Sequence, residues 1–204
     1  MERLKNPPSF DGLSFSEPSH TYRLDGVEIP SVTKIIEPIS RSVYGSIDDA
    51  VLQKAASRGT SVHSAIELWL TYGVEDIPSE HMPYFSAFRS WYDSVNPEII
   101  GMEIRLLHRL MRYAGTCDLL CYIGDQLTLV DYKTTSSVNT RLCAVQLEAY
   151  AQALLSVGVK VDRKVILHLS KTGRWREHEF AAKDPQSWIV FGSCKTIYDY
   201  NQQK

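Results

Sequence analysis

The sequence predicts an α/β fold in which helices flank a central mixed β-sheet. Three observations predict it. Apolar residues recur at helical spacing from about residue 47 to 94, three strand-like runs follow from 98 to 133, and a helix, two strands and a last helix occupy about 140 to 201. This order of elements is typical of an α/β sandwich. Residues 46–204 are therefore expected to form a single structural unit.

An N-terminal arm and hairpin, residues 1–45, are expected to precede this unit. Residues 1–20 are rich in Pro, Ser and Gly, which favours a mostly irregular arm. Asp25-Gly26 lies between short runs of alternating apolar residues and predicts a hairpin turn. Ser31 can cap a short helix, "VTKIIEPI", that stops near Pro38.

Helices and strands then follow in order. A helical region covers about residues 47–72, with Gly59 as a weak point where two helices could meet and Gly73 as a stop. A second helix covers 80–94, where large apolar residues recur at three-residue spacing. The runs "EIIGMEIRLLHRL", "YAGTCDLLCYI" and "QLTLVDYK" predict three consecutive antiparallel strands, the last two joined by a tight turn at Gly124-Asp125. A helix over 140–156, two strands joined by the turn 171–174, and a helix over 184–201 complete the chain.

Composition narrows the class of protein. The 204 residues are 44% hydrophobic and 23% charged, which favours a packed domain over disorder. No apolar stretch approaches the roughly 18 residues of a membrane helix, and "MERLKNPPSF" lacks the apolar segment of a signal peptide, so a cytoplasmic protein without a membrane partner is expected. The net charge of −2 does not suggest a protein that coats DNA, but it permits a local basic patch, so it neither supports nor excludes a nucleic-acid partner. Free, mostly buried thiols are expected at all four cysteines, Cys117, Cys121, Cys143 and Cys194.

The stretch "LVDYKTT" carries the strongest chemical signal. Asp131 and Lys133 are two residues apart on a strand and share a face. If the strands pair around the turn 124–125, Asp118 lies opposite about position 131. Facing carboxylates repel each other, and a hard divalent cation would turn that repulsion into binding. Lys133 could then orient or help deprotonate a metal-bound water that attacks a phosphodiester. The alternative is an ordinary ion pair at a strand end.

Two helical pairs could contribute to the same site. His63 and Glu67 are four residues apart on one helix face, so a neutral imidazole could complete the metal shell. Gln146 and Tyr150 have the same spacing and could hydrogen-bond the site or a DNA phosphate. A surface His–Glu pair and a helix packed on the sheet are the respective alternatives.

Four segments in order, "RGTSVHSAIE", "YAGTCDLL", "LVDYKTT" and "VQLEAYAQAL", resemble the motifs of the PD-(D/E)xK nuclease superfamily in its RecB-like branch, over residues 58–155. The segment "EIPSVTKIIEP" also resembles the one that precedes the core in mitochondrial genome maintenance exonucleases and related phage proteins. The resemblance implies a restriction-endonuclease-like core with an N-terminal extension, and metal-dependent hydrolysis of DNA.

The resemblance also implies roles for residues. Catalytic roles fall to His63, Asp118, Asp131 and Lys133. The ligands of Mg²⁺ or Mn²⁺ would be His63, Asp118, Asp131 and the carbonyl of Tyr132. Supporting or DNA contacts would come from Glu67, Glu103, Thr134, Gln146 and Tyr150. Independently of the resemblance, Arg109 and Arg174 in the two predicted hairpins are candidate phosphate contacts, with a solvated turn as the alternative. No iron–sulfur cluster is expected, because no cysteine precedes residue 117.

The function expected from these observations is an exonuclease acting on DNA ends or single strands in recombination, replication or repair. A phage or bacterial origin and a single-strand annealing or single-strand-binding partner follow from the resemblance only. A structure-specific or nicking endonuclease would use the same chemistry. A catalytically inactive nucleic-acid-binding module is the alternative of another class.

Overall fold

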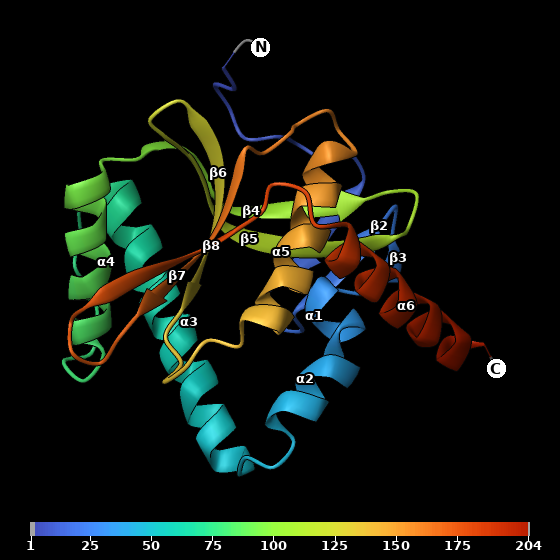
Figure 1. The fold of residues 1–204 in the computed structure, drawn as a ribbon, viewed down its shortest axis with the longest axis horizontal. Helices are drawn as coiled ribbons and strands as arrows, with labels where there is room; N and C mark the ends of the chain where they lie inside the picture. Colours follow the sequence, from blue (N-terminus) through green and yellow to red (C-terminus); the bar gives the residue numbers. More distant parts are fainter. Residues whose placement is uncertain (1–2, 204) are drawn as a thin grey trace.

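A five-stranded sheet separates two groups of helices in the computed structural model, which describes residues 3–203 (Figure 1). Its strands are β4 (Glu98–His108), β5 (Tyr113–Ile123), β6 (Gln126–Lys133), β7 (Arg163–Leu169) and β8 (Trp175–Phe180), in that spatial order. All neighbours are antiparallel except β6 and β7, which are parallel and are connected through α5 (Thr140–Leu155). This mixed sheet confirms the predicted fold class and is consistent with a restriction-endonuclease-like core.

The register of β5 and β6 confirms the pairing expected from the turn. Leu119 lies opposite Val130 and Ile123 opposite Gln126, so the same register continued by one residue places position 118 opposite 131. A two-residue turn leaves little freedom in how the strands align, which explains why a local signal was sufficient.

Helices cover both faces of the sheet. On one face, α3 (Asp49–Tyr72) and α4 (Met82–Val95) pack against residues of β5, β6 and β7 such as Leu119, Val130 and Val165. On the other face, α1 (Val32–Ile35), α5 and α6 (Pro185–Gln202) cover residues of the opposite parity, such as Leu120 and Leu129. The recurring aromatic residues of α4 are fully buried, and each contributes on the order of 2–3 kcal/mol.

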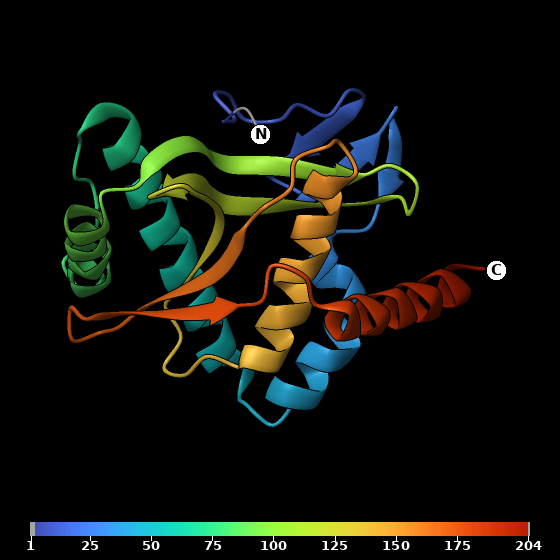
Figure 2. The ribbon, with the colours of Figure 1, turned by 45° about the horizontal axis from the view of Figure 1, so that its top comes forward.

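A separate antiparallel sheet of three strands lies beside the β4–β5 hairpin (Figure 2). It consists of β1 (Leu13–Ser16), β2 (Thr21–Leu24) and β3 (Val27–Ile29), and the turn at Asp25-Gly26 is confirmed. The prediction of an irregular arm was wrong for 13–16, because β2 offers an edge with which this short segment pairs. The proposed division of the chain at residues 45 and 46 stays a prediction.

Two predictions about the helices need correction. Gly59 does not separate two helices, since α3 runs unbroken through it for 24 residues. A glycine inside a helix costs only about 1 kcal/mol, and burial of the following apolar face of α3 outweighs that cost. The short helix that was expected to stop near Pro38 does end, at Ile35, but a further helix that was not predicted begins around Pro38. Pro38 lies in the first turn of this second helix, α2 (Glu37–Tyr44), where its missing N–H has no partner to lose.

Other features follow the sequence closely. Ser31 caps α1 through a hydrogen bond from the Lys34 amide, and Gly73 ends α3 with a left-handed φ of 70°. All four cysteines are free and buried. Within residues 3–203, no helix combines the length and the apolar character needed to cross a lipid bilayer.

Candidate metal centre

An acidic cluster forms where β4, β5 and β6 lie side by side. Asp118 on β5 and Asp131 on β6 are both buried, at 7% and 3% exposure. Met102 pairs with Leu119 and Ile104 with Cys117, so Glu103 on β4 lies opposite Asp118. Three carboxylates from three adjacent strands therefore meet on one face of the sheet, in a position where their charges repel unless a cation is bound.

His63 reaches the cluster from α3. Its Nδ1 lies 3.5 Å from Asp118 Oδ1 and 4.0 Å from Glu103 Oε1. One donor atom from each of His63, Glu103 and Asp118 lies within 4.8 Å of the others. Carboxylate oxygens with one imidazole nitrogen are ligands for a hard or borderline divalent cation. The donor set thus fits a metal ion.

Hydrogen bonds hold the two aspartates in place. Asp118 Oδ2 accepts a bond of 2.6 Å from the backbone N–H of Tyr132. Asp131 Oδ1 accepts a bond of 2.9 Å from Gln146 Nε2, and that amide also contacts the Tyr150 hydroxyl at 3.1 Å. Both α5 residues lie at the site, as the spacing suggested, and they fix the side chain of Asp131.

Lys133 pairs with Asp131, its Nζ lying 2.5 Å from Asp131 Oδ2. Burial lowers the pKa of Lys133, but the charges of Asp131 and Asp118 outweigh burial, and its pKa lies above the ordinary value. Lys133 is therefore a fixed cation.

Protons compensate the cluster when no metal is bound. Burial and the neighbouring Asp118 raise the pKa of Glu103 to about 7. Burial is also the main cause that raises the pKa of Asp131 to about 6, against the opposing effect of Lys133. Burial lowers the pKa of His63, yet the charge of Asp118 outweighs it and raises this pKa to about 9. His63 and part of Glu103 therefore hold protons at neutral pH, because the carboxylates around them carry excess negative charge. A divalent cation could take the place of these protons.

Glu103 occupies an unusual backbone conformation. Its φ is 46°, in the left-handed region that side chains other than glycine, asparagine and aspartate rarely adopt. Such a residue costs on the order of 1–3 kcal/mol and persists where the surroundings require it, commonly at functional sites. Glu103 therefore belongs to the centre of the cluster, whereas the sequence placed it only among the supporting residues.

The remaining residues of the predicted site lie around or away from this centre. Thr134 is buried. The ring of Tyr132 packs in the core under α3 and α4 and meets the ring of His63 edge-on, with 5.4 Å between the ring centroids, while the Tyr132 backbone N–H holds Asp118. The role of its carbonyl stays a prediction. Glu67 is exposed on α3, and its charge adds to the raised pKa of Glu103.

The structure does not bring the two hairpin arginines to the cluster. Arg109 lies six residues beyond Glu103, about 20 Å along an extended chain, and hydrogen-bonds the Asp11 carbonyl at 2.5 Å and the Asp25 carboxylate at 3.5 Å. Arg174 is exposed in the β7–β8 turn. Both lie in turns, and their local sequence carries no information about which distant element they contact.

One neighbour of the site was missed altogether. His168 on β7 pairs with Lys133 in the parallel register, and its Nε2 lies 2.7 Å from the Thr135 carbonyl. It therefore fixes the segment that leaves β6. Only the parallel β6–β7 register reveals this contact, and the sequence did not specify that register.

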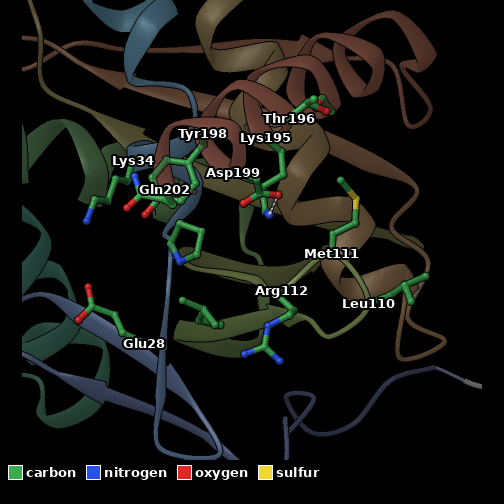
Figure 3. Close-up of a pocket in the computed structure, with 13 residues that line it drawn as sticks. Glu28, Lys34, Leu110, Met111, Arg112, Lys195, Thr196, Tyr198, Asp199 and Gln202 are labelled. Carbon is green, nitrogen blue, oxygen red and sulfur yellow. Dashed lines mark hydrogen bonds and ion pairs between the residues drawn. The ribbon is translucent and has the colours of Figure 1, made fainter. Parts of the chain in front are cut away.

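A hollow of about 710 Å³ lies between α6 and the tip of the β4–β5 hairpin (Figure 3). Lys195, one of its cations, is paired with Asp199 at 2.5 Å. None of the cluster residues line this hollow.

Comparisons with known proteins leave the family open. No protein-family model and no curated protein matches the chain. Among solved structures, SSO0001 is 14% identical with a TM-score of 0.47, and the match covers 82% of this chain and 74% of SSO0001. The alkaline exonuclease LHK-Exo from Laribacter hongkongensis is 10% identical with a TM-score of 0.40, over 72% of this chain and 85% of that one. Its complex with dAMP gives 11% identity and a TM-score of 0.39 over the same shares. At these scores, the function has to be argued from the site itself.

Glu103→Gln is expected to stabilise the metal-free protein by about 1–2 kcal/mol at pH 8. The raised pKa of Glu103 means that the folded state holds the ionised carboxylate less well than the unfolded chain does. The gain should shrink as the pH falls from about 7 to 4.5, and vanish when Glu103 is protonated in both states. Urea unfolding at three pH values, with the exposed Glu28→Gln as control, measures this. If Glu103→Gln is less stable than the unchanged protein at pH 8, the pKa of Glu103 is not raised in the folded state.

Proposed function

We propose that this protein is a metal-dependent nuclease that hydrolyses phosphodiester bonds of DNA. The observation that carries the proposal is the convergence of the donor atoms of His63, Glu103 and Asp118 beside the buried Asp131–Lys133 pair. The order of the four motifs from residue 58 to 155, which resemble those of RecB-like nucleases, supports the choice of DNA.

Each residue has a distinct part in the proposed reaction. His63, Glu103, Asp118 and Asp131 would hold Mg²⁺ or Mn²⁺, which supplies an activated water and a Lewis acid when bound. Lys133 stabilises the negative charge that develops on the phosphate oxygens. Gln146 keeps Asp131 in position through the Oδ1 bond, and Tyr150 in turn keeps Gln146 in position.

An exonuclease that acts on DNA ends or single strands is the form of the activity we favour, from the resemblance to RecB-like exonucleases. The same resemblance suggests work beside a single-strand annealing or single-strand-binding protein in recombination, replication or repair. A structure-specific or nicking endonuclease would share the site. An inactive binding module is disfavoured, because Asp118, Asp131 and Lys133 are all present and adjacent.

The proposal is tested by incubating 5′- and 3′-labelled DNA, single-stranded and duplex, with Mg²⁺, Mn²⁺ or EDTA. We expect product with either metal, none in EDTA, and none from Asp118→Asn purified in the same way. A duplex whose ends are blocked separates the two forms of activity, since an endonuclease still cuts it. Equal product from Asp118→Asn would point to a contaminant, and no product from any substrate would favour the binding module.

The affinity for Mg²⁺ is expected to rise as the pH increases from 6 to 9. Binding has to displace protons from Asp131, Glu103 and His63, whose pKa values are about 6, about 7 and about 9. Calorimetric titration at pH 7 in buffers of different ionisation enthalpy counts the released protons, and we expect roughly one or more per ion. An affinity that is independent of pH would show that the ion binds elsewhere.

A further inference from the structure

A groove of about 730 Å³ opens beside the acidic cluster. One wall is formed by the end of α2 and the first half of α3, and the other by the β6–α5 connection and the start of α5. Figure 1 shows these segments facing each other in the lower part of the molecule. The groove reaches His63 and Lys133, so whatever fills it is adjacent to the proposed reaction site.

The charges that line the groove are of one sign. Lys54, Arg58 and Lys133 line it, and no aspartate or glutamate does among the described residues. The whole chain, by contrast, has a net charge of −2. Hydroxyl groups of the segment 134–137 add hydrogen-bond donors. A lining of this kind attracts an anion and can hydrogen-bond it.

Arg58 is held ready for such an anion. Its Nε donates a hydrogen bond of 3.4 Å to Thr134 Oγ1, and its guanidinium lies 5.2 Å from the ring centroid of Tyr84. In the described chain, no carboxylate pairs with this half-buried guanidinium. Its other N–H donors are therefore available, and a guanidinium matches the geometry of a phosphate.

The rest of the groove is apolar. Val51 and Leu52 of α3 remain 58% and 36% exposed, and Val138 and Leu142 lie on the opposite wall. Between them, the small side chain of Ala55 leaves room. A nucleobase presents apolar faces to such walls only when it is unstacked, whereas a duplex covers those faces with neighbouring base pairs.

We propose that this groove binds an unpaired strand of DNA, with Arg58 on the phosphate next to the reacting one and a base against Val51, Ala55 and Leu142. This inference rests on the proposed nuclease function. It adds that the DNA bound next to the reacting phosphate is single-stranded. A duplex is then a substrate only where its end is unpaired.

Binding in EDTA tests the groove without any cleavage. The probe is a fluorescein-labelled strand of about 12 nucleotides, alone or annealed into a blunt duplex, followed by fluorescence anisotropy. We expect the single strand to bind about tenfold more tightly than the duplex. Equal affinities, or no binding of the single strand, would overturn the proposal.

Two substitutions, each with a matched control, locate the strand. Ala55→Phe fills the groove and should weaken single-strand binding about tenfold, whereas Ser57→Phe, exposed on the same helix but outside the lining, should not. Arg58→Ala should weaken it by a similar factor, whereas the exposed Arg176→Ala should not. If Ala55→Phe unfolds, as judged by circular dichroism, Arg58→Ala decides. Binding that both groove substitutions leave unchanged would overturn the proposal.

The outcomes also separate this inference from the proposed reaction. A protein that binds the single strand in EDTA, loses that binding on Arg58→Ala, yet never cleaves DNA with Mg²⁺ would retain the groove and contradict the nuclease. A protein that cleaves DNA but binds duplex as tightly as single strand would retain the nuclease and contradict the groove.

Discussion

Lys133→Ala is expected to lower DNA cleavage by about 10²- to 10³-fold without lowering the affinity for Mg²⁺. The Nζ of Lys133 contacts Asp131 rather than providing a lone pair to a cation, and its raised pKa keeps it charged. Its removal takes away positive charge near the reacting phosphate but leaves every donor of the cluster in place. Single-turnover cleavage rates and a calorimetric Mg²⁺ titration measure the two effects separately.

Two comparisons make this prediction specific. Asp118→Asn should lower both cleavage and Mg²⁺ affinity, because Asp118 belongs to the donor set. Lys160→Ala, which removes an exposed lysine, should change neither. Full activity in Lys133→Ala would refute its role, and a parallel loss of Mg²⁺ binding would mean that Lys133 acts by holding the cluster together.

Lys164→Met is expected to lower the free energy of unfolding by about 3–5 kcal/mol. Lys164 on β7 and Glu148 on α5 form an ion pair whose side chains are 0% and 2% exposed. Removing the lysine leaves a buried carboxylate whose remaining hydrogen bond, from Gln152 Nε2 at 2.8 Å, cannot replace a charge. Urea unfolding at pH 7 measures the loss.

The double substitution Glu148→Leu with Lys164→Met should recover most of that stability, because two apolar side chains can replace a buried pair at little cost. Lys195→Met serves as a control. It removes the partner of Asp199, which is 51% exposed, and should cost less than about 1 kcal/mol. If the double variant is as unstable as Lys164→Met alone, shape rather than charge dominates at this position.

Local signals explain which parts of the fold were predictable. The central strands are short, mostly apolar runs, and tight turns marked by Gly124 and Gly173 bound them. Both the extent of the strands and the β5–β6 register therefore followed from neighbouring residues. The same register predicted that Asp118 and Asp131 lie side by side. The spacing of His63 and Gln146 on their helices left a surface pair and a packed helix open as alternatives, and their place at the site was expected from the resemblance of the motifs.

Non-local contacts explain what was not predictable. The position of Glu103 depends on the β4–β5 register, which is irregular between Ile99 and Gly101, and on a left-handed backbone that no neighbouring residue signals. Arg109 pairs with Asp25, 84 residues away, instead of a ligand. Arg58 is a candidate phosphate contact only because distant segments of the chain form a groove around it.

Helix α5 serves two purposes at once. Gln146 and Tyr150 fix Asp131 on β6, while Glu148 between them pairs with Lys164 on β7. A single residue inserted into or deleted from this helix rotates everything beyond it by about 100° and separates one set of partners from the other. All residues of α5 from 145 to 151 are buried, so neither the length of the helix within 146–150 nor its side chains there can change freely.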